Sequence, residues 1–368
     1  MGINDIVIYI MVIFMIVGAI DKMFKNKLGL GQHFDEGLMA MGSLALAMIG
    51  IIVMAPVIAD VLSPVVVPIY TALGADPAMF AGSLLAIDMG GLQLAQEMAL
   101  SDDAAMFSGV ILAAMMGATI VFSIPVSLGI IRKEDQRFLA TGMLAGFIAI
   151  PVGAIVGGLV AGYSFGMVIT NLIPIFILAA LVILGLWKIP EKMIKGFTIF
   201  GHGVVIVATA GLAIGIVDVL TGITIVPGIA PLAEGIEVVG SIAIVLAGAF
   251  VMVEVITRVF KKPLMSVGKV LGMNEVSAAG MVATLANNIA MFNLMKDMDD
   301  RGKIINVAFS VPAAFVLGDH LGFAAGVARE MIVPMMAGKL LGGVAAVFIA
   351  ILIANMILGK RDKKAAVQ

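Results

Sequence analysis

Ionisable and amide side chains stand in two segments that are otherwise strongly apolar. Segment 77–100 carries Asp88 next to a pair of glycines, and segment 276–295 carries Asn287 and Asn288. A carboxylate such as Asp88 suits an ammonium ligand, through charge pairing and hydrogen bonding. An amide both donates and accepts hydrogen bonds, so an asparagine suits a hydroxyl group. Candidate partners for an ammonium and for a hydroxyl therefore occur in two different parts of the chain.

Each of these candidates also has a structural interpretation. Asp88 can cap the helix that follows the two glycines, and an asparagine pair can cap the backbone at a hairpin tip. Gln93 and Glu97 follow Asp88 in the same segment and are further candidates for substrate binding. Glu97 lies nearer the segment end, where an interfacial position is the simpler interpretation.

Two more pairs complete the predicted site. Asp319 and His320 are adjacent and can form a second charged pair, with a residue that titrates near neutrality when exposed. Thr119 and Ser123 are one helical turn apart, so they face the same side of a helix and can line a path. The alternative for Thr119 and Ser123 is hydrogen bonding to their own helix carbonyls, which bends the helix.

The elements that must position these residues are membrane helices. The chain has 368 residues, of which 62% are apolar and 12% charged, and its mean hydropathy is +1.17. Apolar windows of about 20 residues, enough to cross a hydrocarbon core, recur along the whole length. The runs are continuously apolar without the alternation of barrel strands. We predict an all-α polytopic membrane protein with a single integral membrane transport domain over residues 1–368.

Eleven hydrophobic segments are separated by charged residues, prolines and glycines. They are 3–21, 37–62, 77–100, 104–131, 138–162, 167–187, 197–222, 236–257, 276–295, 304–318 and 331–358. If all of them crossed, the basic residues would divide evenly between the two sides, against the positive-inside bias. If 77–100 and 276–295 are instead re-entrant hairpins, all but two of the 22 basic residues become cytoplasmic.

The predicted topology therefore has nine full transmembrane helices and two re-entrant hairpins. The N-terminus is outside and the C-terminus is cytoplasmic in the inner membrane, with a basic tail at 359–368. The two hairpin regions also resemble each other, since each leads to an acidic pair and then a long span. Residues 76–131 and 274–330 are candidate units of an inverted repeat, a common plan for transporters with a midplane site.

Several classes of function are disfavoured. The chain lacks cysteine, so disulfides, thiolate metal sites and cysteine nucleophiles are excluded. We expect no cofactor, metal or catalytic residue, and no basic stripe indicates nucleic acid. The lipid bilayer is the expected partner. GxxxG patterns begin at Gly153, Gly158, Gly211 and Gly338; we expect them to mark internal packing, with a homo-oligomer as the alternative. His202, between two glycines, is interpreted as structural.

Seven ordered motifs resemble one known family, the ethanolamine utilisation permeases. The motifs are FDEGLMAMG at 34–42, LLAIDMGG at 84–91, TIVFSIP at 119–125, IPEKM at 189–193, KPLMSVGK at 262–269, AAGMVATLANN at 278–288 and DHLGFAA at 319–325. The resemblance covers nearly the whole chain. It implies uptake of ethanolamine to supply a cytoplasmic ammonia-lyase.

The driving force is not implied by the resemblance. Ethanolamine is chiefly a cation at neutral pH, so a negative-inside potential draws it inward at about 2.3 kcal/mol per 100 mV. Facilitated diffusion therefore suffices, and a proton-coupled amine symporter is the alternative. A membrane-embedded hydrolase, with Asp88 and Asp319 as an aspartyl pair, is a less favoured alternative because Val316 and Leu317, not a glycine motif, precede Gly318. A scaffold that anchors a metabolic compartment is disfavoured because the cytoplasmic loops are short.

Overall fold

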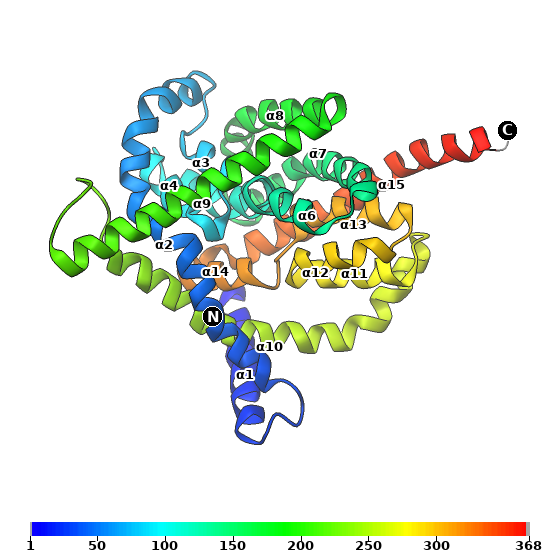
Figure 1. Cartoon of the computed structure of the whole chain (residues 1–368), viewed down its shortest axis with the longest axis horizontal. Coiled ribbons are helices and arrows are strands. Elements are labelled where there is room, and N and C mark those ends of the chain that lie inside the picture. The colour runs from blue at the N-terminus through cyan, green and yellow to red at the C-terminus, as the bar shows by residue number, and fades with distance from the viewer. Residues whose placement is uncertain (1, 366–368) are drawn as a thin grey trace.

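The protein is a bundle of helices, several of which are interrupted (Figure 1). The computed structural model describes residues 2–365, and these contain no strand. The side chains of residues 260–262, 264, 265, 267, 269 and 358–368 are not described, so the basic tail and part of the cluster before it lie outside the described side chains. The long helices are α1 (Ile3–Met23), α2 (Gly31–Ala72), α7 (Gln136–Val160), α8 (Phe165–Lys188), α9 (Pro190–Thr221), α10 (Leu232–Val270) and α15 (Ile332–Ala365).

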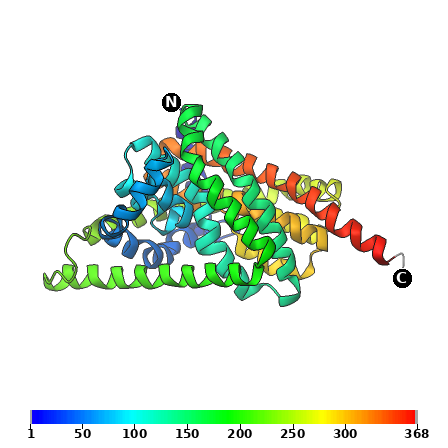
Figure 2. The ribbon, with the colours of Figure 1, turned by 90° about the horizontal axis from the view of Figure 1, so that it is seen from above.

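Eight helical stretches of the described chain are long and apolar enough to cross a membrane. They include the seven long helices and the composite stretch Asp102–Ile130. They correspond to eight of the nine predicted spans, so the chain is a multi-pass all-α membrane protein. Figure 2 shows how α9 and α15 run along the outside of the bundle. The ninth predicted span, 304–318, has a different structure, which is described below.

The segment predicted as the first hairpin is broken in the middle. Helix α3 (Ala78–Leu84) ends before the short 3₁₀ turn η1 (Ile87–Met89), and α4 (Gly91–Met98) follows. Gly90 joins η1 to α4 with φ of 83°, a left-handed conformation that favours glycine. The two ends of the segment lie together, because the Leu100 amide donates to the Asp76 carboxylate at 3.0 Å. The chain therefore returns to where it started.

The second predicted hairpin, α11 (Glu275–Ala286) and α12 (Asn288–Leu294), is broken at a single residue, Asn287. Its ends also lie together. The Asn274 amide, before α11, donates to Asp299 at 2.8 Å, and its side chain donates to the Asp297 carbonyl at 3.0 Å. The paired ends have the geometry that a hairpin requires, whereas its insertion into the membrane stays a prediction.

A third break lies in the region predicted as span 304–318. Helix α13 (Asp300–Ala313) has 14 residues, a rise of about 21 Å that is shorter than a bilayer core. Residues 314–318 are irregular, and α14 (Asp319–Val327) follows. The Phe315 and Leu317 amides donate to the carbonyls of Thr284 and Leu285, at 3.1 and 2.9 Å. The end of α11 thus satisfies backbone groups that this break frees, as buried irregular backbone at membrane depth requires.

The stretch Asp102–Ile130 crosses the centre of the molecule and is mostly π-helical. It consists of α5 (Asp102–Met106), the π-helices η2 (Phe107–Gly117) and η3 (Thr119–Ser123), and α6 (Ile124–Ile130). Every residue of η2 is buried. The remaining short turns are η4 (Lys133–Asp135), η5 (Met295–Asp297) and η6 (Arg329–Met331). Extended π-helix is rare, and single π turns often occur at functional sites.

Glycines bring pairs of long helices into backbone contact inside the chain. A Cβ at Gly153 of α7 would lie 2.7 Å from the Gly338 carbonyl of α15, and one at Gly338 would lie 2.7 Å from the Gly153 carbonyl. Gly211 of α9 approaches the Gly50 backbone of α2 in the same way. These GxxxG patterns serve internal packing, since small residues allow close helix approach.

Candidate functional site

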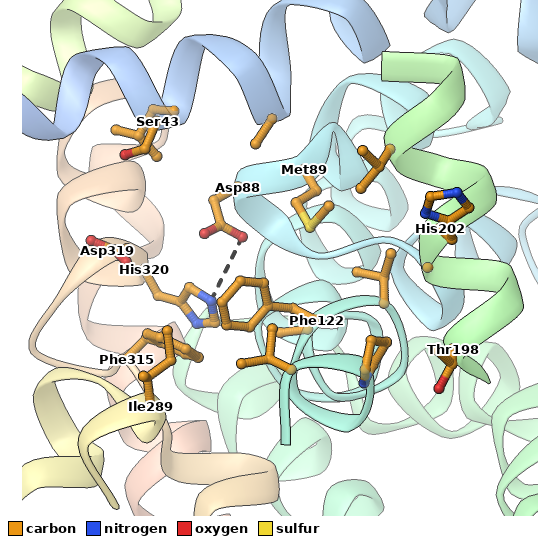
Figure 3. A pocket seen from close by; sticks show the side chains of 18 residues that line it. Ser43, Asp88, Met89, Phe122, Thr198, His202, Ile289, Phe315, Asp319 and His320 are labelled. Atoms are coloured by element: carbon orange, nitrogen blue, oxygen red, sulfur yellow. Dashed lines mark ion pairs between the residues drawn. The ribbon is translucent and has the colours of Figure 1, made fainter. Parts of the chain in front are cut away.

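The three breaks converge on one central cavity of about 620 Å³ (Figure 3). Its wall comes from α2, η1, η3, α6, α9, α12, the irregular residues 314–318 and α14. The lining side chains are mostly apolar, with polar groups from six residues: Ser43, Asp88, Thr198, His202, Asp319 and His320. A cavity of this size and character is typical of a small-molecule site.

Asp88 projects from the first break toward His320 of α14. Asp88 Oδ1 lies 3.9 Å from His320 Nε2, beyond hydrogen-bonding distance. The Asp88 side chain is 22% exposed and the His320 side chain 1% exposed, so the carboxylate faces the cavity and the imidazole forms part of its wall. The Phe315 ring packs on His320 with centroids 5.1 Å apart and holds the imidazole in place. His320 Nδ1 has no hydrogen-bond partner among the described residues.

Asp319 provides a second carboxylate to the same cavity. It occupies the first turn of α14, directly after the third break. Asp88 and Asp319 interact electrostatically, as two carboxylates near one cavity must. Like-charged groups in an apolar wall are stabilised by a shared cation. The structure therefore brings together Asp88, Asp319 and His320, three of the residues that the sequence suggested.

The cavity continues from these carboxylates to the first turns of α9. Thr198 and His202 line its far end, and the His202 side chain is exposed. Ser43 of α2 lies on the side of the cavity nearest Asp88 in Figure 3. His202 was interpreted as structural from the sequence, and that interpretation misses its place on the cavity wall. A histidine between glycines carries no periodic signal that would show which way it faces.

Thr119, Ser123 and Asn288 lie behind the cavity wall. The Thr119 hydroxyl donates to the Met115 carbonyl at 2.7 Å, the helix back-bonding that was the alternative for this residue. The Asn288 side chain donates to Ser123 Oγ at 2.7 Å. This bond joins the two candidate repeat units, because Ser123 belongs to 76–131 and Asn288 to 274–330. All three residues are buried and do not line the cavity.

Three further candidates lie away from the cavity. Asn287 accepts a hydrogen bond from the Ile289 amide at 2.7 Å and thereby caps α12, the structural alternative for this residue. Glu97 is exposed near the end of α4. The Gln93 Oε1 atom is buried and has no hydrogen-bond partner within the described chain. None of these three lines the cavity.

Lys339 is a buried basic residue that the sequence analysis did not select. It lies on α15 and is 1% exposed. Its ammonium donates to the Ala114 carbonyl of the π-helix η2 and interacts electrostatically with Asp88 and His320. One signal was available, because Lys339 and Arg329 are the two basic residues that the predicted topology does not place in the cytoplasm.

Comparisons with known proteins agree with the family resemblance. A family model described as "Ethanolamine utilisation protein, EutH" matches residues 3–353. A Listeria monocytogenes protein described as "Probable ethanolamine permease EutH" is 68% identical over 99% of this chain and 98% of its own length. The Escherichia coli K12 protein of the same description is 53% identical over 99% and 98%.

A Bacillus subtilis relative, described as the uncharacterized protein YxeR, is 49% identical over 94% of both chains. No solved structure matches this chain. The similarity extends through every span and every break described above. The chain therefore belongs to the family of ethanolamine utilisation protein EutH.

Proposed function

We propose that this protein is a permease for ethanolamine and that the ammonium group binds between Asp88 and Asp319. The observation that carries the proposal is the pair of carboxylates facing one mostly apolar cavity where three helix breaks meet. Broken helices at a central site are the recurrent plan of secondary transporters. Relatives over nearly the full length are described as probable ethanolamine permeases.

The cavity offers partners for both ends of the ligand. The carboxylates can form charge-assisted hydrogen bonds to the ammonium, the strong class of such bonds. The hydroxyl of Ser43 is a candidate for the ligand hydroxyl. Asn288 contributes indirectly, through Ser123 and the wall that both residues support. Ethanolamine is smaller than the cavity, so water fills the remaining volume.

The membrane potential is a sufficient driving force. A monovalent cation gains about 2.3 kcal/mol per 100 mV on moving to the negative side. The ligand brings its own charge to the carboxylates, so the site needs no coupling ion to bind it. We therefore favour facilitated diffusion over proton symport.

The described conformation opens toward the cytoplasm if the predicted orientation holds. Thr198 and His202, at the far end of the cavity, lie in the first half of α9, after Lys188, Lys192 and Lys195. By the positive-inside rule, that basic cluster is expected on the cytoplasmic side of the inner membrane. With the N-terminus outside and the C-terminus inside, the cavity is then the inward-facing state.

Uptake of radiolabelled ethanolamine into proteoliposomes tests the function, with the potential and the pH gradient imposed separately. Uptake should follow a negative-inside potential and should not respond to an inward proton gradient at zero potential. Empty liposomes are the control. Uptake that requires the proton gradient would establish the symporter instead. Product release from purified protein, in place of uptake, would establish the hydrolase.

A homo-oligomer stays a further prediction. The GxxxG pairs of α7 and α15 are used within the chain, so other glycines would have to form its interface. Gly162 and Gly166 meet no neighbouring atom of the described chain within 4 Å of an added Cβ. The mass of the purified particle, measured by light scattering with the detergent contribution subtracted, would determine the oligomeric state.

A further inference from the structure

A second cavity, of about 580 Å³, lies at one end of the helix bundle, between η4, the start of α7 and the start of α9. The connections before α7 and before α9 are separated by two candidate spans, so they lie at the same membrane surface. Thr198 lines this cavity and the central one, so the two are neighbours. A cavity of this size can hold a small ligand or a lipid headgroup.

Three basic side chains from three elements line the second cavity. They are Lys133 of η4, Arg137 of α7 and Lys195 of α9, and all three are exposed. None of them forms an ion pair with another residue of the described chain. Like charges around one cavity repel each other, and an anion bound between them would remove that repulsion.

Two carboxylates also line the second cavity, and they do not balance the three basic groups. Glu134 Oε1 lies 3.6 Å from a guanidinium nitrogen of Arg132, which is outside the cavity lining. Glu191 occupies the first turn of α9, where the helix dipole favours a negative charge. The second cavity therefore has an excess of positive charge.

The remaining wall and its surroundings are apolar and interfacial. Leu128 and Ile194 line the cavity between the charged groups. Trp187, the only tryptophan of the chain, is 66% exposed just before α9, and the Lys188 ammonium lies 4.3 Å from the centre of its ring. An exposed tryptophan at the end of a span is typical of the membrane–water interface. The cavity thus combines a positive charge with apolar walls at headgroup depth.

We propose that the second cavity binds the headgroup of an anionic phospholipid, with its phosphate between Lys133, Arg137 and Lys195. Basic pockets between transmembrane helices on the cytoplasmic side are suited to such headgroups. The predicted orientation places this cavity in the cytoplasmic leaflet, because the same basic residues determine that orientation. The apolar wall residues give the phospholipid a place for its acyl chains that a soluble phosphate compound would not use. The inference goes beyond the proposed function and does not depend on it.

Native mass spectrometry of the full chain, purified in a nonionic detergent, tests the proposal. Phosphatidylglycerol and phosphatidylcholine are added separately, and the lipid-bound fraction of the protein gives each affinity. We expect wild type to bind phosphatidylglycerol about tenfold more tightly than phosphatidylcholine, or better, and the triple variant K133Q/R137Q/K195Q to lose this preference. The matched control K25Q/K27Q/K192Q changes the net charge equally outside the cavity and should keep the preference within about twofold.

A variant with the opposite expected sign keeps the test decisive if the triple variant does not fold. E191Q removes a carboxylate from the cavity and should bind phosphatidylglycerol about threefold more tightly than wild type. Equal binding of the two lipids by wild type overturns the proposal, as does an equal loss in the control variant. Glycerol 3-phosphate that binds as tightly as phosphatidylglycerol would assign the cavity to a soluble phosphate compound instead. Ethanolamine is absent throughout, so a failure of the proposed function would leave these results unchanged.

Discussion

The first and second breaks were both expected to contribute polar side chains to one site, with Asp88 the stronger partner, and they differ in what those side chains do. At the first break Asp88 faces the cavity, and its side chain is 22% exposed. At the second break Asn287 caps α12 and Asn288 bonds to Ser123, fully buried. At the second break the polar side chains thus form hydrogen bonds within the protein. At the first break the Asp88 carboxylate is available to a ligand.

The difference follows from how each break satisfies its backbone. The first break uses the left-handed Gly90 and a 3₁₀ turn, which needs no side chain from Asp88. The second uses the Asn287 side chain, and the carbonyls at the end of α11 support the third break. At the first break a glycine thus performs the structural task, and the neighbouring carboxylate faces the cavity.

Asp88→Asn should have the largest effect. Loss of the carboxylate leaves a desolvated ammonium without its main partner, at a cost of about 2–5 kcal/mol in binding. Initial rates of ethanolamine and ethylamine uptake should fall together, because both ligands carry the ammonium. Size-exclusion profiles check that the variant is folded. Wild-type uptake by a folded D88N protein would make Asp88 a helix cap and move the site elsewhere.

Gly90→Ala should come next, through the backbone of the first break. The φ of 83° is strained for alanine, and the new Cβ would overlap the Ile51 side chain. Strain of this kind costs about 1–3 kcal/mol, with further cost from overpacking. Thermal unfolding should show a lower Tm for G90A than for N287A, which loses only a cap. A larger loss in N287A would reverse the comparison.

Asn288→Ala should act on stability more than on binding. It removes the bond to Ser123, a buried side-chain pair, at a cost of about 1–2 kcal/mol in the free energy of unfolding. S123A should cost a similar amount, and the double variant should cost less than the sum because the bond is lost once. Additive losses in denaturant titrations would show that the two residues act independently.

Glu97→Gln should have the smallest effect, because the side chain is exposed at the end of α4 and away from the cavity. Uptake rates should equal those of wild type within about twofold, as expected of a surface substitution. E97Q is thus the matched control for D88N, since each removes one carboxylate from the same hairpin. If E97Q reduced uptake as much as D88N, the effect of D88N would come from the loss of negative charge in general and not from a contact between Asp88 and the ligand.

The sequence was sufficient for the membrane class, for eight spans and for the location of the first two breaks, because hydropathy and charge distribution are local properties. It did not reveal that α13 ends at Ala313, since residues 304–318 are mostly apolar and the cause, hydrogen bonding to the end of α11, is tertiary. The same holds for the cavity: which of Asp88, Thr119 and Asn288 faces it depends on packing. Lys339 was missed because the GxxxG pattern that contains it was interpreted as helix packing alone.

The central claim is that the ligand ammonium binds Asp88, and a distance measurement by solid-state NMR tests it most directly. Protein with ¹³Cγ-labelled aspartate, reconstituted in liposomes, would be measured with ¹⁵N-ethanolamine by rotational-echo double resonance. A charge-assisted hydrogen bond of 2.7–2.9 Å implies an N-to-Cγ distance of about 3.5 Å. We predict dephasing at that distance in wild type and N288A, and weaker dephasing in D88N, where Asp319 is the remaining labelled partner. Dephasing that is unchanged in D88N would place the ammonium on another aspartate and contradict the account.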